Sequence, residues 1–144
     1  MRQLAKQVKL NISANQPLTI IGIVSVENDL KLSWAINQLL DIQLTQSNML
    51  TIQQSKTGNK LEFPLFQFED DKHLLKFSLL ANRYKLNYFF DELKNIDFTL
   101  IIRGELDFEN KAEILLRLKT SPEITSLLLI DSNSLRKKEN LDFF

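Results

Sequence analysis

The chain has 144 residues, of which 44% are apolar, 9% aromatic and 25% charged, and 18 Lys and Arg balance 18 Asp and Glu. This composition is typical of a globular protein, so it excludes collagen-like, low-complexity and disordered chains. The balanced charge leaves no net field to attract nucleic acid or an anionic membrane surface, and the lack of cysteine removes disulfides, thiolate nucleophiles and thiolate zinc sites.

Two strands are predicted near the start of the chain. Apolar and polar residues alternate over residues 5–12, which is the period of a half-buried strand. After a turn, residues 18–24 are almost continuously apolar and rich in β-branched side chains, as in a buried strand. We expect the two strands to pair antiparallel, and we expect Gly22 to mark a bulge or a close backbone approach.

A helix is predicted over residues 28–41, with Asn28 or Ser25 available as its N-cap. Apolar residues that recur at the helical period indicate the side that faces the core. They are Leu32, Ala35, Ile36, Leu39 and Leu40.

The opposite side of this helix carries two large apolar side chains. Leu30 and Trp34 lie one turn apart and share that side with polar residues, among them Asn37 and Asp41. Such a pair can anchor a protein interface, each anchor contributing about 2 kcal/mol or more. It can equally be covered by another part of the same chain, which is the commoner fate of a tryptophan. Both interpretations stay open at this point.

Three strands of a meander are predicted at residues 49–54, 60–69 and 74–82, and a turn around Gly58 joins the first two. In the middle strand the alternation of apolar side chains shifts by one residue at Pro64. This shift predicts a bulge or an edge position.

A short amphipathic helix is predicted over residues 86–95, because four apolar residues lie at positions i, i+3, i+4 and i+7. They are Leu86, Phe89, Phe90 and Leu93. A strand over residues 96–102 follows directly.

The second half of the chain then predicts a helix that is capped by Asp107 and ends before Pro122. Residues 124–130 follow as a strand that is apolar enough to be central. If the strands on either side of the helix are parallel, they form a right-handed βαβ crossover. We therefore expect an α+β fold: a mixed, mostly antiparallel sheet with about three helices and a C-terminal βαβ-like unit. The apolar end, residues 141–144, is expected to pack back on the body.

The sequence contains neither a linker nor a repeat, so we expect one domain over residues 1–144. No stretch approaches the roughly 20 apolar residues of a membrane helix. The first nine residues lack the apolar region of a signal peptide. We therefore expect a cytoplasmic protein without a membrane segment.

Residues 90–98 resemble the signature that names the IPExxxVDY family of small bacterial proteins. Glu92 and Asp97 match two named letters, and Asp91 stands where the family has proline. Apolar or aromatic replacements occupy three further named positions: Phe90, Ile96 and Phe98. The resemblance extends over most of the chain and implies no activity, ligand or catalytic residue. We expect the two aromatic residues to lie in the core and the two matching carboxylates to secure the turn.

Familiar catalytic motifs are absent from the sequence. The three glycines lie too far apart for a Walker loop or a dinucleotide fingerprint. His73 is the sole histidine, which excludes HExxH and histidine-rich zinc sites, and no GxSxG sequence supports a catalytic serine. We assign no catalytic residue and expect no cofactor.

One candidate ligand or metal site follows from the predicted topology. If the two strands of the βαβ-like unit are parallel, the loops after them open at the same edge of the sheet. Glu105, Asp107 and Asp131 then come together as ligands for Mg²⁺ or another hard cation, with Arg103 as an anion contact. The simpler explanation is that these acidic residues cap helices, where the helix dipole favours them.

We therefore expect a non-catalytic protein-interaction or adaptor module that binds another protein, or itself, through Leu30 and Trp34 or through a sheet edge near Pro64. One alternative is a small metal-dependent enzyme or ligand-binding protein that uses the carboxylates. Another is an RNA-associated accessory protein that uses the basic run at residues 136–138, although this short run is more simply a solvated helix face.

Overall fold

The computed structural model describes residues 16–54, 57–136 and 138–144, and it is built around one antiparallel sheet. The strands of this sheet are β1 (Leu18–Val24), β2 (Thr45–Gln46), β5 (Leu65–Asp70), β6 (Leu75–Ala81), β9 (Phe98–Arg103) and β10 (Ser126–Ile130). Their order is β10-β1-β9-β6-β5-β2, and every neighbouring pair is antiparallel. Two ribbons lie outside the sheet: β3 (Leu50–Gln53) with β4 (Lys60–Phe63), and β7 (Arg83–Tyr84) with β8 (Asn87–Tyr88). The predicted α+β class with a mostly antiparallel sheet is confirmed.

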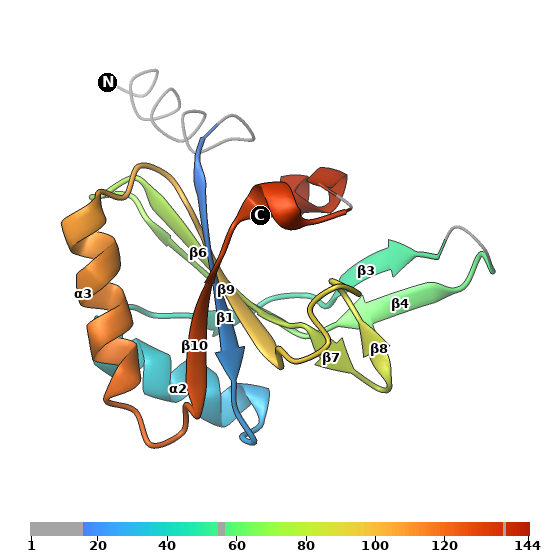
Figure 1. The fold of residues 1–144 in the computed structure, drawn as a ribbon, viewed down its shortest axis with the longest axis horizontal. Helices are drawn as coiled ribbons and strands as arrows, with labels where there is room; N and C mark the ends of the chain where they lie inside the picture. Colours follow the sequence, from blue (N-terminus) through green and yellow to red (C-terminus); the bar gives the residue numbers. More distant parts are fainter. Residues whose placement is uncertain (1–15, 55–56, 137) are drawn as a thin grey trace.

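The helices α2 (Asp29–Leu40) and α3 (Phe108–Lys119) cover one face of the sheet (Figure 1). The short helices η1 (Ser132–Ser134) and η2 (Lys138–Phe143) lie on the other side, above the two ribbons in that view. Leu141 and Phe144 are buried there, so the predicted packing of the apolar chain end on the body is confirmed.

Two cores occupy the two faces of the sheet. The larger core lies between the sheet and the helices and includes Ile21, Leu100 and Ile36. The smaller core lies under the C-terminal residues and includes Ile20 and Ile101. Adjacent residues of one strand enter different cores, as the two-residue period of a strand requires.

Both long helices begin at the caps that the sequence predicts. The Asn28 side chain accepts a hydrogen bond of 2.8 Å from the Lys31 N–H, and Asp107 accepts one of 2.8 Å from the Asn110 N–H. Such side chains replace hydrogen bonds that the first turn of a helix cannot make internally. The helix predicted over residues 28–41 is therefore confirmed as α2.

The strands β9 and β10 are both antiparallel to β1, which lies between them, so they run in the same direction without touching. The βαβ-like unit is thus split by β1. The strand predicted over residues 5–12, and with it its predicted pairing with β1, lies outside the described residues. One detail of the prediction is wrong: β10, expected to be central, stands at the edge of the sheet that the described residues form.

The middle of β1 passes close to two other side chains. A Cβ atom added to Gly22 would lie 2.9 Å from Cδ1 of both Ile130 and Ile96. The register of β1 with both neighbours continues through Gly22. The glycine therefore marks a close approach of side chains, and the prediction of a close backbone approach or a bulge at Gly22 is wrong.

The strand predicted over residues 60–69 breaks at Pro64. The residues before the break form β4 in a ribbon with β3, and those after it form β5 in the main sheet. Proline has no N–H to donate to a strand neighbour, so the chain leaves one sheet and enters another at this point. The shift in the alternation of apolar side chains at Pro64 is confirmed, but its cause is a break between two strands rather than a bulge.

The prediction of a helix over residues 86–95 is wrong, because this segment forms β8 and a series of turns. The buried side chain of Asn82 organises it. Its Nδ2 donates hydrogen bonds to the carbonyl oxygens of Leu93 (2.9 Å) and Ile96 (3.0 Å). Its Oδ1 accepts one of 2.9 Å from the N–H of Phe90. These bonds satisfy backbone groups that a helix would have paired internally.

Candidate functional site

The outer side of α2 presents the two apolar residues singled out in the sequence. Leu30 is 62% exposed and Trp34 is 64% exposed, so no other described part of the chain covers them. Leu30, Trp34, Asn37 and Asp41 follow one another at helical spacing, and we call them the α2 surface. Large apolar side chains held on a capped helix form a rigid contact surface.

The two polar members of the α2 surface hold the connection from α2 to β2. Asn37 donates a hydrogen bond of 3.1 Å to the carbonyl oxygen of Leu44 and accepts one of 2.8 Å from its N–H. Asp41 ends the helix in the left-handed conformation, with φ of 54°. Its side chain stays exposed beside a hollow of about 440 Å³ that Trp34 also lines. Asn37 is therefore a positioning residue, whereas Asp41 is available to a partner.

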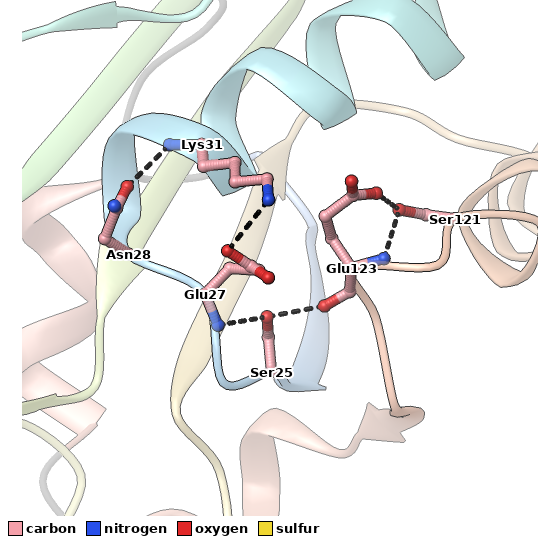
Figure 2. A network of polar contacts seen from close by, with 6 residues as sticks. All are labelled: Ser25, Glu27, Asn28, Lys31, Ser121 and Glu123. Atoms are coloured by element: carbon pink, nitrogen blue, oxygen red, sulfur yellow. Dashed lines mark hydrogen bonds and ion pairs between the residues drawn. The ribbon is translucent and has the colours of Figure 1, made fainter.

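A polar network fixes the start of α2 against the segment between α3 and β10 (Figure 2). The buried Ser25 hydroxyl donates a hydrogen bond of 2.6 Å to the carbonyl oxygen of Glu123 and accepts one of 3.1 Å from the N–H of Glu27. Glu27 in turn forms an ion pair of 3.4 Å with Lys31. Leu30 therefore sits on a helix end that is tied to a distant part of the chain.

The Glu123 side chain completes this network. The Ser121 hydroxyl donates a hydrogen bond of 2.8 Å to Oε2 of Glu123 and accepts one of 3.2 Å from the Glu123 N–H (Figure 2). The hydrogen bond from Ser121 is the main reason why the pKa of Glu123 lies below its usual value, and the charge of Lys31 adds to it. The carboxylate therefore stays ionised at neutral pH.

The motif at residues 90–98 is structural. Phe90 and Phe98 are buried, as expected. The Asp97 carboxylate accepts a hydrogen bond of 3.0 Å from the N–H of Ser25 and forms an ion pair of 2.8 Å with Arg83. Glu92 forms no hydrogen bond or ion pair with the described residues. Of the two matching carboxylates, Asp97 is the one that secures the surrounding loops.

Arg103, the predicted anion contact, is buried and holds the C-terminal residues. Its guanidinium donates hydrogen bonds to the carbonyl oxygens of Phe144 and Leu141, the latter at 2.7 Å, and reaches that of Gln16 at 3.4 Å. Burial lowers the pKa of Arg103 while the charge of Asp142 raises it. Arg103 is therefore engaged with the C-terminal residues of its own chain, and its role as an anion contact for a ligand stays a prediction.

The three predicted carboxylate ligands are exposed and do not form a metal site. Asp107 caps α3, and Asp131 caps η1 by accepting a hydrogen bond of 3.0 Å from the N–H of Asn133. Glu105 lines the cavity of about 480 Å³ that lies beside α3 and is described below. Among residues 16–54, 57–136 and 138–144, no three His, Asp or Glu side chains are placed to hold a metal ion. The capping explanation therefore accounts for Asp107 and Asp131.

The sequence did not predict a cavity of about 480 Å³ between the end of α2, the β5–β6 turn and α3. Its lining mixes apolar and acidic side chains, among them Leu75, Phe77, Leu106, Ile114, Asp41 and Glu105. Four further lining residues are paired with each other: His73 Nδ1 lies 2.8 Å from Asp70 Oδ2, and Arg117 lies 2.9 Å from Glu113. The lining contains no serine, threonine or lysine, so it offers no hydroxyl or amine nucleophile.

Asp70 closes the β5–β6 turn at this cavity. Burial raises the pKa of the Asp70 carboxyl, but three hydrogen bonds outweigh that effect. The side chain and the N–H of His73 make two of them, and the Lys72 N–H makes the third. The resulting pKa lies below the usual value. Asp70 and His73 thus stabilise the β5–β6 turn.

The basic run at residues 136–138 is only partly described. Arg136 is exposed, and the Lys138 amino group lies 3.5 Å from Oδ1 of Asn133. Lys137 lies outside the described residues. Within the described parts of the chain, none of the helices has the length and apolar character needed to cross a membrane.

Comparison with models of known protein families yields no match to this chain, and comparison with curated proteins yields none either. The resemblance of residues 90–98 to the IPExxxVDY signature therefore stays a prediction.

Proposed function

We propose that this protein is a non-catalytic cytoplasmic interaction module that binds another protein through the α2 surface. The observation that carries this proposal is the exposure of Leu30 and Trp34 on a helix whose two ends are both fixed. Burial of a tryptophan side chain is favourable, and the described residues leave Trp34 exposed to water. A bound partner that covers Trp34 would gain this free energy of burial.

The chemistry of the α2 surface defines the partner. Leu30 and Trp34 occupy positions i and i+4, a spacing at which a helix inserts apolar anchors into a groove, and Asn37 holds the end of this surface in place. The indole N–H of Trp34 has no hydrogen-bond acceptor among the described residues. We therefore expect a partner with an apolar groove, an acceptor for the indole and a donor for the exposed carboxylate of Asp41.

We also propose membership of the IPExxxVDY family, on residues 90–98, which adds no activity. The alternative of a metal-dependent enzyme ranks lower, because Arg103, Asp107 and Asp131 are each engaged within their own chain. The alternative of RNA binding rests on residues 136–138, where one position lies outside the described residues.

The test is co-purification with three versions of the full chain: wild type, a Leu30→Ala/Trp34→Ala double variant, and the control Leu86→Ala. Leu86 is a matched control because it is a large apolar residue that is 96% exposed, on the turn between β7 and β8. We expect one partner to be retained by wild type and control and lost by the double variant, at unchanged melting temperature. Equal recovery of every partner by all three folded proteins would overturn the proposal.

A further inference from the structure

The edge strand β10 has the composition of a central strand. Its sequence, Ser-Leu-Leu-Leu-Ile, has no charged residue, proline or glycine, which are the devices that usually protect an edge. On one side it pairs with β1, and on the other it pairs with no strand among the described residues. Backbone groups that no described strand pairs, together with exposed leucines, are suited to pairing with another strand.

Apolar side chains border this edge on the sheet and on the neighbouring helix. Leu128 and Leu129 are 55% and 51% exposed and point to opposite faces of the sheet. Figure 1 shows α3 beside β10, and the two elements are in contact. On α3, the exposed Phe108 and Leu116 lie on the side turned away from the residues that line the 480 Å³ cavity.

We infer that two copies of the chain form a two-fold dimer by antiparallel pairing of their β10 strands. Pairing centred on Leu128 places this residue opposite its own copy, Leu127 opposite Leu129, and Ser126 opposite Ile130. A two-fold interface must be complementary to itself. This one joins two uncharged strands, so no like charges meet in the pairing.

The side of α3 next to this edge is complementary to itself in the same way. α3 and β10 have similar lengths, about 18 Å and 17 Å by their rise per residue, and the proposed dimer has its axis near the middle of both elements. A two-fold axis that crosses α3 at the level of Ile114, on the side opposite to this cavity-lining residue, places the small Ala112 opposite the large Leu116 of the other copy, and it places Glu109 opposite Lys119.

Glu109 and Lys119 are both exposed, and neither forms an ion pair with a described residue. The dimer therefore gains two rim ion pairs without breaking existing ones. Their opposite charges at opposite ends of one helix favour the antiparallel arrangement of two copies over a parallel one.

The chain contains no cysteine, so a Leu128→Cys variant tests the pairing directly. Residues directly opposite each other in antiparallel strands have Cα atoms about 4.5–5.5 Å apart, within reach of a disulfide. With oxidised glutathione as the oxidant, we expect Leu128→Cys to become a disulfide-linked dimer. The control Leu86→Cys, with a more exposed thiol far from β10 along the chain, should remain largely monomeric. Equal trapping of the two variants, or no trapping of either, would overturn the inference.

A charge exchange provides a second measurement that does not depend on cysteine chemistry. Glu109→Lys and Lys119→Glu each put like charges together at both rim positions, whereas the double variant restores opposite charges. We expect each single variant to raise the dimer dissociation constant by roughly threefold to tenfold, and the double variant to recover the wild-type value. Light scattering over a dilution series measures the change between the 16.8 kDa monomer and twice that mass. A monomeric wild type at every concentration would overturn the inference.

Discussion

The guanidinium of Arg103 donates a hydrogen bond of 2.7 Å to the carbonyl oxygen of Leu141 and so ties β9 to the C-terminal residues. We predict that Arg103→Met lowers the free energy of unfolding by about 2–4 kcal/mol, because buried carbonyl oxygens lose a charged donor. Arg103→Lys should not restore it, since an ammonium group lacks the planar fork of donors. Urea denaturation measures both, with the exposed Arg136→Met as a control that should change stability by less than about 0.5 kcal/mol.

Asn82 provides the second prediction. Replacing Asn82 by Asp keeps the acceptor for the Phe90 N–H but removes both donors to backbone carbonyls and puts a negative charge beside them. We expect a loss of roughly 3 kcal/mol of unfolding free energy. The exposed Asn95→Asp should cost little. Similar midpoints for the two variants in urea would show that Asn82 does not organise the 89–97 segment.

Glycine positions with positive φ provide a third, graded prediction. At Gly104 φ is +129°, and a Cβ atom would lie 2.5 Å from the carbonyl oxygen of Leu74. At Gly58 φ is +71°, and the nearest atom would lie 4.0 Å away. We expect Gly104→Ala to cost roughly 3 kcal/mol or more and Gly58→Ala about 1 kcal/mol. Thermal denaturation would contradict this if Gly58→Ala lowered the melting temperature by the larger amount.

The lowered pKa of Asp70 predicts how stability depends on pH. A carboxyl group whose pKa is lower in the folded than in the unfolded protein stabilises the fold above the unfolded pKa, near 3.9. That contribution is lost as pH falls through the folded pKa. Wild type should therefore lose more unfolding free energy below about pH 4 than Asp70→Asn does. The two proteins should differ most at neutral pH, by roughly 1 kcal/mol. A constant difference from pH 7 to pH 2 would exclude this role for Asp70.

Local signals in the sequence predicted the elements that local chemistry determines. Asn28 and Asp107 are N-caps, and the alternation of apolar side chains shifts where Pro64 divides two strands. The prediction of a helix at residues 86–95 failed because its apolar residues are spaced at the helical period but are buried or exposed for unrelated reasons. Leu86 lies in a tight turn with φ of 68°, whereas Phe90 is held by Asn82. A hydrogen bond to a side chain outside the segment leaves no trace in its periodicity.

The sequence predicted one part of the candidate site and missed the arrangement of the rest. The side of α2 that carries Leu30 and Trp34 follows from helical period, but only the structure shows that described residues leave it uncovered. Glu105, Asp107 and Asp131 were grouped because the two strands before them were expected to be parallel; β9 and β10 do run in the same direction, but β1 lies between them. Long-range strand order also explains why β10, apolar enough for a central position, was not expected at the edge.

Trp34 is the only tryptophan of the chain, which permits a direct test of its proposed role in binding. With 5-fluorotryptophan incorporated in this chain alone, its single ¹⁹F resonance reports the exposure of Trp34 to a dissolved paramagnetic probe. We predict strong broadening in the isolated protein and protection once the co-purified partner is added. Protection in the isolated protein, or broadening that the partner leaves unchanged, would contradict binding through the α2 surface.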